Sequence, residues 1–403
     1  MVNGRKVVCI GGGTGLSTLL KGIKEYVNSG MPDHELIDLD ELVAIVSVAD
    51  DGGSSGRLID EFGILPPGDI RNCMVALADE SELLTKLFSF RFQGSGPLGG
   101  HSLGNLLLTA LTQMFDGNFQ KAVEVASRVL SIRGRILPVS LDNTILCAQL
   151  EDGTIVEGQS YIPKRTNRSP IKRVFLKPRN GEGEVKAHPE AVEAIMNADA
   201  IIIGPGSLYT SVMPNLALPE ISDALSRSEA IKIYVCNVMA EPGETDGYTV
   251  SDHVQAVLDH APMKLDYVLV NSAIAPEELI KQYIREELLE QFNRIKAQAE
   301  EAISAIDGEF GNCRLEELME ISLRIAELSR NAHKIADPLR VQILYREEVD
   351  GPRLKGIKVI QEDMIRGEMI RDKVDGAIVR KKVIRHDPIK LAGVIVRILK
   401  GEV

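Results

Sequence analysis

The sequence predicts a Rossmann-like α/β fold, with a helical subdomain inserted into a parallel sheet and an extra helical hairpin. The first observation is that apolar runs alternate with helix-like stretches from residue 5 to about residue 275. These runs are continuously apolar, as expected for strands that helices cover on both faces of a sheet. The second observation is that glycine-rich loops follow several of the runs, where open α/β folds bind ligands.

The strands of the predicted sheet are short runs rich in isoleucine and valine. Residues 70–132 hold several periodic apolar segments and no convincing strand, which predicts a helical subdomain over about residues 70–135. Residues 145–176 have β character and turn signals, which predict a small antiparallel sheet. A final helix is expected from about Ile389 to Leu399. The strands predicted for the main sheet are Lys6–Ile10, Val43–Val48, Ala200–Ile203, Ile231–Val235, Tyr267–Val270, Val341–Tyr345 and Gly356–Ile360.

Residues 277–332 differ from the rest of the chain, because apolar residues recur every three or four positions among many charges. A break at residues 307–312 divides this pattern in two, which predicts a helical hairpin. The hairpin either projects from the core, where it packs against a partner subunit in a homo-oligomer, or folds back on its own sheet. The nucleotide-binding domain then comprises residues 1–276 and 333–403.

The composition argues against nucleic-acid binding and against membrane insertion. The 403-residue chain has a net charge of −12, no tryptophan and only 4% aromatic residues, so it offers little basic surface and few rings for stacking. No apolar run is long enough to span a bilayer, and the first strand begins too early to leave room for a signal peptide. Five cysteines without C-x-x-C spacing indicate reduced thiols. We therefore expect a cytoplasmic protein.

The first strand runs directly into a glycine loop that opens a helix. This order aims backbone N–H groups and the positive end of a helix at one point, which favours a phosphate group. The loop is not a P-loop because no Lys-Ser/Thr pair ends it, and Ser17 stands near the third glycine position of the dinucleotide fingerprint. The ligand-binding residues predicted here are Gly12, Gly13, Thr14 and Gly15, with hydroxyl donors from Thr14 and Ser17.

An acidic loop follows the second strand. Asp50 and Asp51 stand at the strand terminus, where adjacent carboxylates suit a divalent cation or ribose hydroxyls. Arg57, at the end of the same loop, is a candidate partner for a phosphate. Asp69 is a candidate third carboxylate of this site and also a candidate N-cap of a helix that begins at Ile70, and the two roles can coexist. Asp50 and Asp69 are the predicted ligands of such a cation.

Two further loops of small residues and one strand end complete the predicted cleft. His101 and Asn105 are four residues apart, so a helix would place them on one face, where they meet a ligand or serve a structural role. Several polar strand ends together indicate one shared cleft. No nucleophile–base pair or histidine metal spacing stands out, so no catalytic residue is predicted. The other predicted ligand-binding residues are Gly204, Gly206, Ser207, Tyr209, Thr210 and Asn237.

Six short segments of the sequence together resemble the YvcK (gluconeogenesis factor) branch of the CofD-like superfamily, also called UPF0052. They are residues 10–16, 48–58, 66–72, 99–105, 204–211 and 383–387. The resemblance implies a Rossmann-like fold and a UDP-sugar ligand such as UDP-N-acetylglucosamine. It also implies a regulatory role in cell-wall synthesis and cell shape during growth on gluconeogenic carbon sources, with cell-wall synthesis regulators as partners and no required cofactor.

The resemblance makes Tyr267 and Arg385 candidates for contacting the nucleotide sugar. The alternatives are a core strand residue for Tyr267 and a solvated charge for Arg385. The sister branch, CofD proper, implies a second function: a Mg²⁺-dependent enzyme that transfers a phospholactyl group from a nucleotide diphosphate donor to a deazaflavin. Asp50, Asp51 and Asp69 resemble its acidic positions. An NAD(P)-dependent oxidoreductase is a third reading, disfavoured because no acidic residue is clearly placed about 20 residues beyond the glycine loop.

Overall fold

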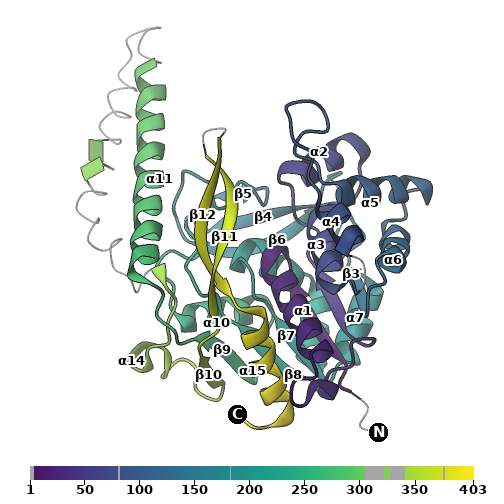
Figure 1. Cartoon of the computed structure of the whole chain (residues 1–403). Helices are drawn as coiled ribbons and strands as arrows, with labels where there is room; N and C mark the ends of the chain where they lie inside the picture. The colour runs from purple at the N-terminus through teal and green to yellow at the C-terminus, as the bar shows by residue number, and fades with distance from the viewer. Residues whose placement is uncertain are drawn as a thin grey trace.

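The computed structural model describes residues 4–79, 82–181, 183–304, 322–323, 325–326, 341–374 and 377–403. Its centre is a seven-stranded parallel sheet in the order β10-β9-β8-β7-β1-β2-β3, so the predicted α/β class is confirmed (Figure 1). The order reverses between β1 and β7, because β1 pairs with β2 on one side and with β7 on the other. The strands are β1 (Val7–Gly11), β2 (Val43–Val46), β3 (Arg135–Pro138), β7 (Ala200–Ile203), β8 (Ile231–Val235), β9 (Tyr267–Asn271) and β10 (Lys358–Glu362).

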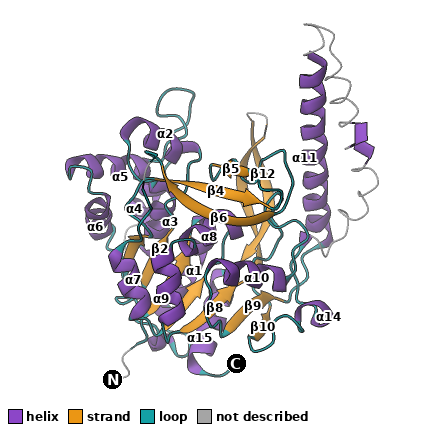
Figure 2. Ribbon diagram, turned by 180° about the vertical axis from the view of Figure 1, so that it is seen from behind, coloured by secondary structure: helices purple, strands orange, loops and turns teal. Residues whose placement is uncertain are grey.

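Helices cover both faces of the sheet. The face nearer the viewer in Figure 1 carries α1 (Gly13–Asn28), α3 (Pro67–Leu77) and α15 (Pro388–Lys400). The opposite face carries α7 (Pro189–Met196), α9 (Pro219–Arg227) and α10 (Val250–His260), as Figure 2 shows. The remaining described helices are η1 (His34–Leu36), α2 (Gly53–Phe62), α4 (Glu82–Ser89), α5 (Leu103–Met114), α6 (Phe119–Val129), η2 (Leu208–Val212), α8 (Met213–Leu216), α11 (Glu277–Ser304) and α14 (Glu347–Asp350).

The core forms because the central strands and one stripe of each flanking helix are apolar. All five residues of β1 are buried, and α1 buries Leu16, Leu19 and Ile23 completely, at the helical spacing of three and four residues. Helix α15 begins where the Asp387 carboxylate accepts the N–H groups of Ile389 and Lys390 at 3.0 Å, and it ends at a left-handed glycine. The four described cysteines are buried and unpaired.

The structure corrects two strand predictions. Strand β3 was not predicted. It is an edge strand of four residues that ends in a proline. It follows the stretch predicted to be helical, which contains α3, α4, α5 and α6. The strand predicted over Val341–Tyr345 is wrong. Only Gln342 of that run forms a bridge, to Met239, and the following residues lead into the short helix α14.

Two antiparallel pieces and one long helix stand outside the main sheet. The small sheet predicted over residues 145–176 is confirmed as β5-β4-β6, made of β4 (Thr144–Leu150), β5 (Ile155–Glu157) and β6 (Ile171–Pro178). A hairpin of β11 (Ile365–Val374) and β12 (Ala377–His386) was not predicted. Both it and the 28-residue helix α11 extend away from the core in the same direction (Figures 1 and 2).

Helix α11 opens the predicted helical hairpin; the break at residues 307–312 and most of the second helix lie outside the described residues. Within the part of the chain that the structure describes, we find no helix with the length and apolar character needed to cross a membrane.

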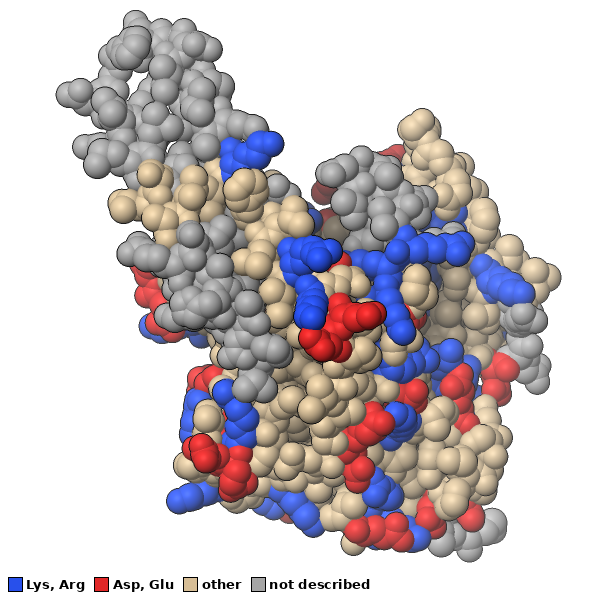
Figure 3. Space-filling view, turned by 60° about the vertical axis from the view of Figure 1, so that its left-hand side comes forward, with Lys and Arg blue, Asp and Glu red and all other residues tan. Residues whose placement is uncertain are grey.

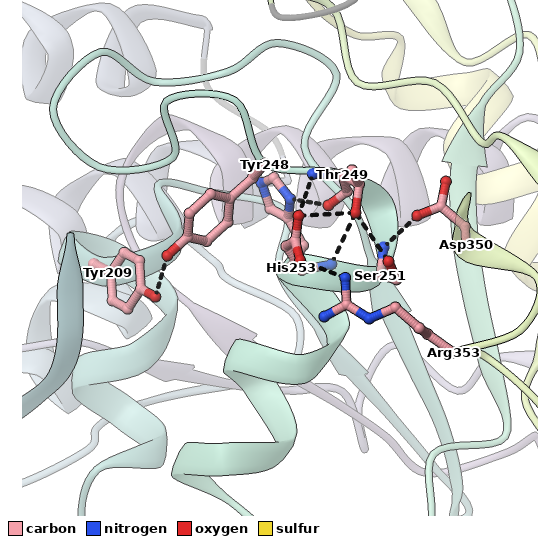
Figure 4. Close-up of polar contacts among 8 residues, drawn as sticks. Tyr209, Tyr248, Thr249, Ser251, His253, Asp350 and Arg353 are labelled. Carbon is pink, nitrogen blue, oxygen red and sulfur yellow. Dashed lines mark hydrogen bonds and ion pairs between the residues drawn. The ribbon is translucent and has the colours of Figure 1, made fainter. Parts of the chain in front are cut away.

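A polar network joins α10 to the segment that follows the insertion (Figure 4). Thr249 caps α10 through a capping box, and the buried Asp350 carboxylate accepts the N–H of Ser251 at 2.8 Å. At the other end of the network, the hydroxyls of Tyr248 and Tyr209 are 2.8 Å apart. This network fixes η2 and the segment around α14 against the same helix.

His253, within this network, makes stability depend on pH. Burial lowers the pKa of His253 from 6.5 to about 4, and its Nδ1–H donates to the Thr249 carbonyl at 2.8 Å. Because the unfolded state binds the proton more readily, the stability from neutral His253 is present above pH 6.5 and is lost as pH falls toward 4. Between pH 7 and pH 5 we expect this group to reduce the free energy of unfolding by about 2 kcal/mol.

Denaturant titrations of wild type and His253→Gln across this pH range test the prediction. The variant stays neutral, so the gap between its stability and that of wild type should narrow as pH falls. The control is His34→Gln, at a half-exposed position, whose curve should run parallel to wild type. A constant gap between wild type and His253→Gln would contradict the prediction.

Candidate functional site

A cavity of about 470 Å³ lies at the carboxyl ends of the central strands. It is bounded by the loops that follow β1, β7 and β8, by the end of β12 and by one residue of α11. This is the position where doubly wound sheets bind ligands, next to the point where the strand order reverses. Eight residues predicted from the sequence line it: Gly12, Gly13, Thr14, Gly15, Gly206, Ser207, Asn237 and Arg385.

The first wall is the glycine loop at the start of α1. Gly12 occupies the N-cap position without a capping side chain, and Gly13 has a φ of +60°, a conformation that favours glycine. The hydroxyl of Ser17 donates to the Thr14 carbonyl at 3.0 Å, so Ser17 is not the ligand donor that the sequence predicted. What the loop offers to the cavity is therefore its backbone N–H groups and the positive end of α1.

The second wall is the loop after β7. Ser207 lines the cavity and donates through Oγ to Glu241 at 2.9 Å. Gly204 lies directly behind this wall and does not line the cavity. Tyr209 and Thr210 are buried in the helical turn that follows, where the Thr210 hydroxyl donates to Glu244 at 2.7 Å. The structure thus places Tyr209 and Thr210 behind the loop, where they hold it, instead of beside a ligand.

The third wall comes from the two elements that project from the core. Arg385, near the end of β12, lies half-buried at the cavity with its Nε 3.9 Å from Glu368. Tyr283 of α11 also lines the cavity, and its hydroxyl accepts the N–H of Ile384 at 3.1 Å. Figure 3 shows basic and acidic side chains interspersed on the face of the molecule where these elements meet the core.

Tyr267 lies away from this cavity. It is the first residue of β9, and the carboxyl end of that strand is Asn271. Its ring packs near the Lys358 ammonium, 5.9 Å from the ring centroid, at the amino end of the paired strand β10. Since all seven strands are parallel, Tyr267 stands at the opposite edge of the sheet from the glycine loop, in the position of a core strand residue.

The Asp69 carboxylate lies directly beneath the glycine loop with Asp50 nearby, and neither of them lines the cavity. Burial and the nearby charge of Asp50 raise the pKa of Asp69 to about 7, while the N–H of Gly13 and Arg71 act in the opposite direction. Burial also raises the pKa of Asp50, whose Oδ1 accepts the N–H of Gly52 at 3.1 Å. Helix α3 begins at Pro67 with Pro66 as its N-cap, so Asp69 is not the N-cap and belongs to this carboxylate pair.

Two carboxylates are too few to enclose a metal ion with protein ligands alone, but they suit Mg²⁺. Mg²⁺ is commonly held by one or two carboxylates and by substrate phosphates and water, and Asp50 and Asp69 lie next to the proposed phosphate loop. Among the described residues, no cluster of three or more His, Cys, Asp or Glu side chains suits a metal ion. Asp51 turns away, because its Oδ1 accepts the N–H of Ser160 at 2.8 Å and anchors the loop after β5.

His101 and Asn105 come together, as their spacing predicts, but around a serine. The Ser54 hydroxyl lies 2.9 Å from His101 Nδ1 and accepts from Asn105 Nδ2 at 3.1 Å. Burial and, secondarily, Arg57 lower the pKa of His101. Arg57 donates to the Gly99 carbonyl at 2.8 Å and does not line the cavity. The hydrogen bonds among Ser54, His101 and Asn105 therefore hold α2 against α5. Of the two roles expected for His101, ligand contact or structure, this is the structural one.

Sequence reasoning missed several residues of the cavity, among them the polar side chains of Glu241, Tyr283 and His386. Glu241 lies in the loop after β8, four residues beyond Asn237, so the rule that strand ends carry the site could have found it. His386 is the residue after Arg385 in a string that was already singled out. For Tyr283 no sequence signal exists, because it lies on an insertion that reads as amphipathic helix.

Comparison with known proteins agrees with this architecture. The family model described as 2-phospho-L-lactate transferase CofD matches residues 7–310. The gluconeogenesis factor of Halalkalibacterium halodurans is 48% identical over 283 residues, which cover 70% of this chain and 82% of that protein. The gluconeogenesis factor of Bacillus subtilis is 47% identical over 279 residues, covering 69% and 82%. Relatives from Clostridium acetobutylicum and a Nostoc species are longer, and the chain spans 59% and 52% of their lengths.

Solved structures resemble the whole described fold. A crystal structure of a Bacillus halodurans protein superposes with a TM-score of 0.72 at 37% identity, covering 98% of this chain and 99% of that one. A second crystal structure, described as a member of the UPF0052 family from the same species, gives a TM-score of 0.70 at 38% identity, covering 97% and 99%.

Proposed function

The chain belongs to the gluconeogenesis factor branch of the CofD family, and from that premise we propose that it is a regulatory protein that binds a nucleotide sugar. The leading ligand is a UDP-sugar such as UDP-N-acetylglucosamine. The proposed role is the support of cell-wall synthesis and cell shape in the cytoplasm during growth on gluconeogenic carbon sources, through cell-wall synthesis regulators as partners.

The single observation that carries the proposal is the convergence of anion-binding groups on one cavity. The Gly12–Gly15 loop offers backbone N–H groups at the start of α1, and Arg385 offers a guanidinium from the other side. Donors of these two kinds bind phosphate oxygens well, because the N–H groups at a helix start have no partner within the helix and arginine contacts oxygens in pairs. The Gly13 N–H already donates to Asp69, so the remaining N–H groups of the loop are the ones offered to a phosphate. A diphosphate lying between the loop and Arg385 would displace the weak 3.9 Å contact between Arg385 and Glu368.

The carboxylate pair beneath the loop favours a second candidate, a Mg²⁺-dependent transferase of the CofD type. Asp50 and Asp69 are both buried enough to have raised pKa values, and their charges repel each other. A bound divalent cation would offset this repulsion and would supply charge stabilisation on a diphosphate. The two candidates share the phosphate site and differ in turnover, which the transferase requires and the regulator lacks.

Isothermal titration calorimetry with UDP-N-acetylglucosamine tests the proposal. Wild type should bind saturably, and Arg385→Ala should weaken binding by about 30-fold, because the loss of one guanidinium–phosphate contact costs about 2 kcal/mol. The matched control is Arg397→Ala on α15, which removes an arginine that pairs with Glu362 outside the cavity. This control should bind like wild type.

Two measurements separate the two candidates: the titration is repeated with and without Mg²⁺, and the protein is incubated with and without Mg²⁺ in the presence of a nucleotide-linked phospho-acid and a deazaflavin acceptor, with the products assayed. Binding without product formation supports the regulator, whereas Mg²⁺-dependent consumption of a nucleotide-linked phospho-acid supports the transferase. If wild type binds no nucleotide under either condition, the proposed ligand class is wrong. Equal affinities for Arg385→Ala and wild type would place the phosphates elsewhere.

A further inference from the structure

Glu241 holds a carboxyl group in fixed orientation inside an anion-binding cavity. It follows β8 and lines the cavity, and its Oε1 accepts from the Ser207 hydroxyl at 2.9 Å. Its backbone N–H donates to the Thr245 hydroxyl at 2.9 Å, which fixes the turn that carries it. One carboxyl oxygen is therefore anchored by Ser207, and no hydrogen bond from a described residue occupies the other.

Glu244, three residues later, shows how a buried carboxylate is satisfied when its role is structural. It accepts the Tyr209 N–H at 3.1 Å and the Thr210 hydroxyl at 2.7 Å, and the positive charge of Arg165 lies nearby. Glu241 forms no ion pair with a described residue. Burial and repulsion from Glu244 raise the pKa of Glu241 to about 8. Burying such a group costs stability, and among the described residues the Ser207 hydroxyl is the one side chain that hydrogen-bonds its carboxyl group.

His386 adds a second acceptor without a partner on the β12 side of the cavity. It lines the cavity, the residue is 93% buried, and its side chain hydrogen-bonds the backbone of Cys236. Burial lowers the pKa of His386 to about 4, so the ring is neutral, and Nε2 has no hydrogen-bond partner. With Nδ1–H donated to the Cys236 carbonyl, Nε2 is left as a bare acceptor that suits a ligand O–H or N–H.

We propose that Glu241, with His386 across the cavity, recognises hydroxyl groups on the sugar portion of the ligand and so determines its specificity. This inference rests on the proposed nucleotide-sugar function. A hydroxyl both donates and accepts, so it pairs with a carboxyl group in either protonation state, whereas a phosphate is repelled by the carboxylate. The glycine loop and Arg385 then hold the phosphates, and Glu241 faces the neutral, hydroxyl-rich part.

The hydroxyls belong either to the hexose or to the ribose, and three ligands distinguish them: UDP-N-acetylglucosamine, UDP and 2′-deoxy-UDP. Affinities for each are measured by calorimetry with wild type, Glu241→Leu and Glu241→Gln. Glu241→Leu should lose about 30-fold in affinity for the nucleotide sugar, because the ligand hydroxyl loses its partner. Glu241→Gln keeps polar atoms in place and should lose less than about fivefold.

Folding and non-specific effects are controlled separately. Replacing a buried carboxylate by leucine removes a desolvation cost, so the variant should keep the thermal midpoint of wild type or raise it. The matched control is Glu229→Leu, at an exposed position before β8 on the opposite edge of the sheet, which should leave all three affinities unchanged.

Each outcome decides a different point. If Glu241→Leu weakens the nucleotide sugar and not UDP, the contacted hydroxyl is on the hexose. If it weakens the nucleotide sugar and UDP but not 2′-deoxy-UDP, the hydroxyl is on the ribose. Affinities within about twofold of wild type, or an equal loss for all three ligands, would overturn the inference while leaving nucleotide binding intact. Absence of binding by wild type would overturn the proposed function and this inference with it.

Discussion

Replacing Gly15 by alanine is expected to weaken nucleotide binding by at least about 100-fold, because the two loops of the cavity must separate to admit one methyl group. A Cβ at Gly15 would stand 2.6 Å from the Pro205 carbonyl carbon and 2.8 Å from Gly206 Cα. Both are backbone atoms, which cannot rotate away as a side chain does. The shift therefore moves the phosphate-binding loop and the Ser207 loop apart, and the groups that must converge on one ligand no longer do.

Calorimetry with UDP-N-acetylglucosamine on Gly15→Ala measures this loss, beside a control from the same loop. At Gly11 the nearest atom to an added Cβ is Leu16 Cβ at 3.5 Å, an ordinary van der Waals contact, and Gly11 does not line the cavity. Gly11→Ala should therefore bind within about threefold of wild type. Equal binding by both variants would show that the spacing of the two loops does not set the affinity.

The strands are predictable from the sequence where the local hydrophobic pattern and the tertiary structure agree. The continuous apolar runs at β1, β2, β7, β8 and β9 can only be satisfied between two helical layers, so pattern and fold coincide. Strand β3 and the residues 341–345 show the limit. β3 is only four residues long, and it is a strand because it pairs with β2, which a local sequence pattern does not reveal. Residues 341–345 are rich in apolar residues like a strand, yet they form a single bridge, and Val341 packs among residues of α11, of β12 and of the loop after β8.

The residues of the site were predictable where the direction of a strand is enough to place them. The Gly12–Gly15 loop, Ser207 and Asn237 all follow strands, and the sheet brings them to one edge. Tyr267 is the first residue of its strand, so the same rule applied to chain direction places it at the other edge of the sheet. Tyr283 and Arg385 could not be placed from spacing, because α11 and β12 reach the cavity through contacts between segments about 100 residues apart.

Replacing Gly22 by alanine is expected to lower the free energy of unfolding by about 3 kcal/mol, since it forces a methyl group into a backbone contact between two packed helices. Gly22 lies on the buried face of α1, where α15 crosses it closely. An added Cβ would stand 2.6 Å from the Pro388 carbonyl carbon and 2.9 Å from Pro388 Cα, at the first turn of α15. Alanine is intrinsically the better helix former by about 1 kcal/mol, so any loss of stability measures the clash and not the propensity.

Denaturant unfolding of Gly22→Ala and of Gly393→Ala, on the facing helix, separates the cost of the clash from the gain in helix propensity. At Gly393 the nearest atom to an added Cβ is the edge of the Tyr26 ring at 3.4 Å, which can yield slightly, so this control should stay within about 1 kcal/mol of wild type. Because Pro388 follows directly on Arg385, His386 and Asp387, a displaced α15 also moves the end of β12 that lines the cavity. Gly22→Ala should therefore lose ligand affinity as well as stability, although Gly22 does not line the cavity. A variant as stable as wild type would mean that α1 and α15 separate at no cost, and that the cavity wall carried by β12 is not held in place by this contact.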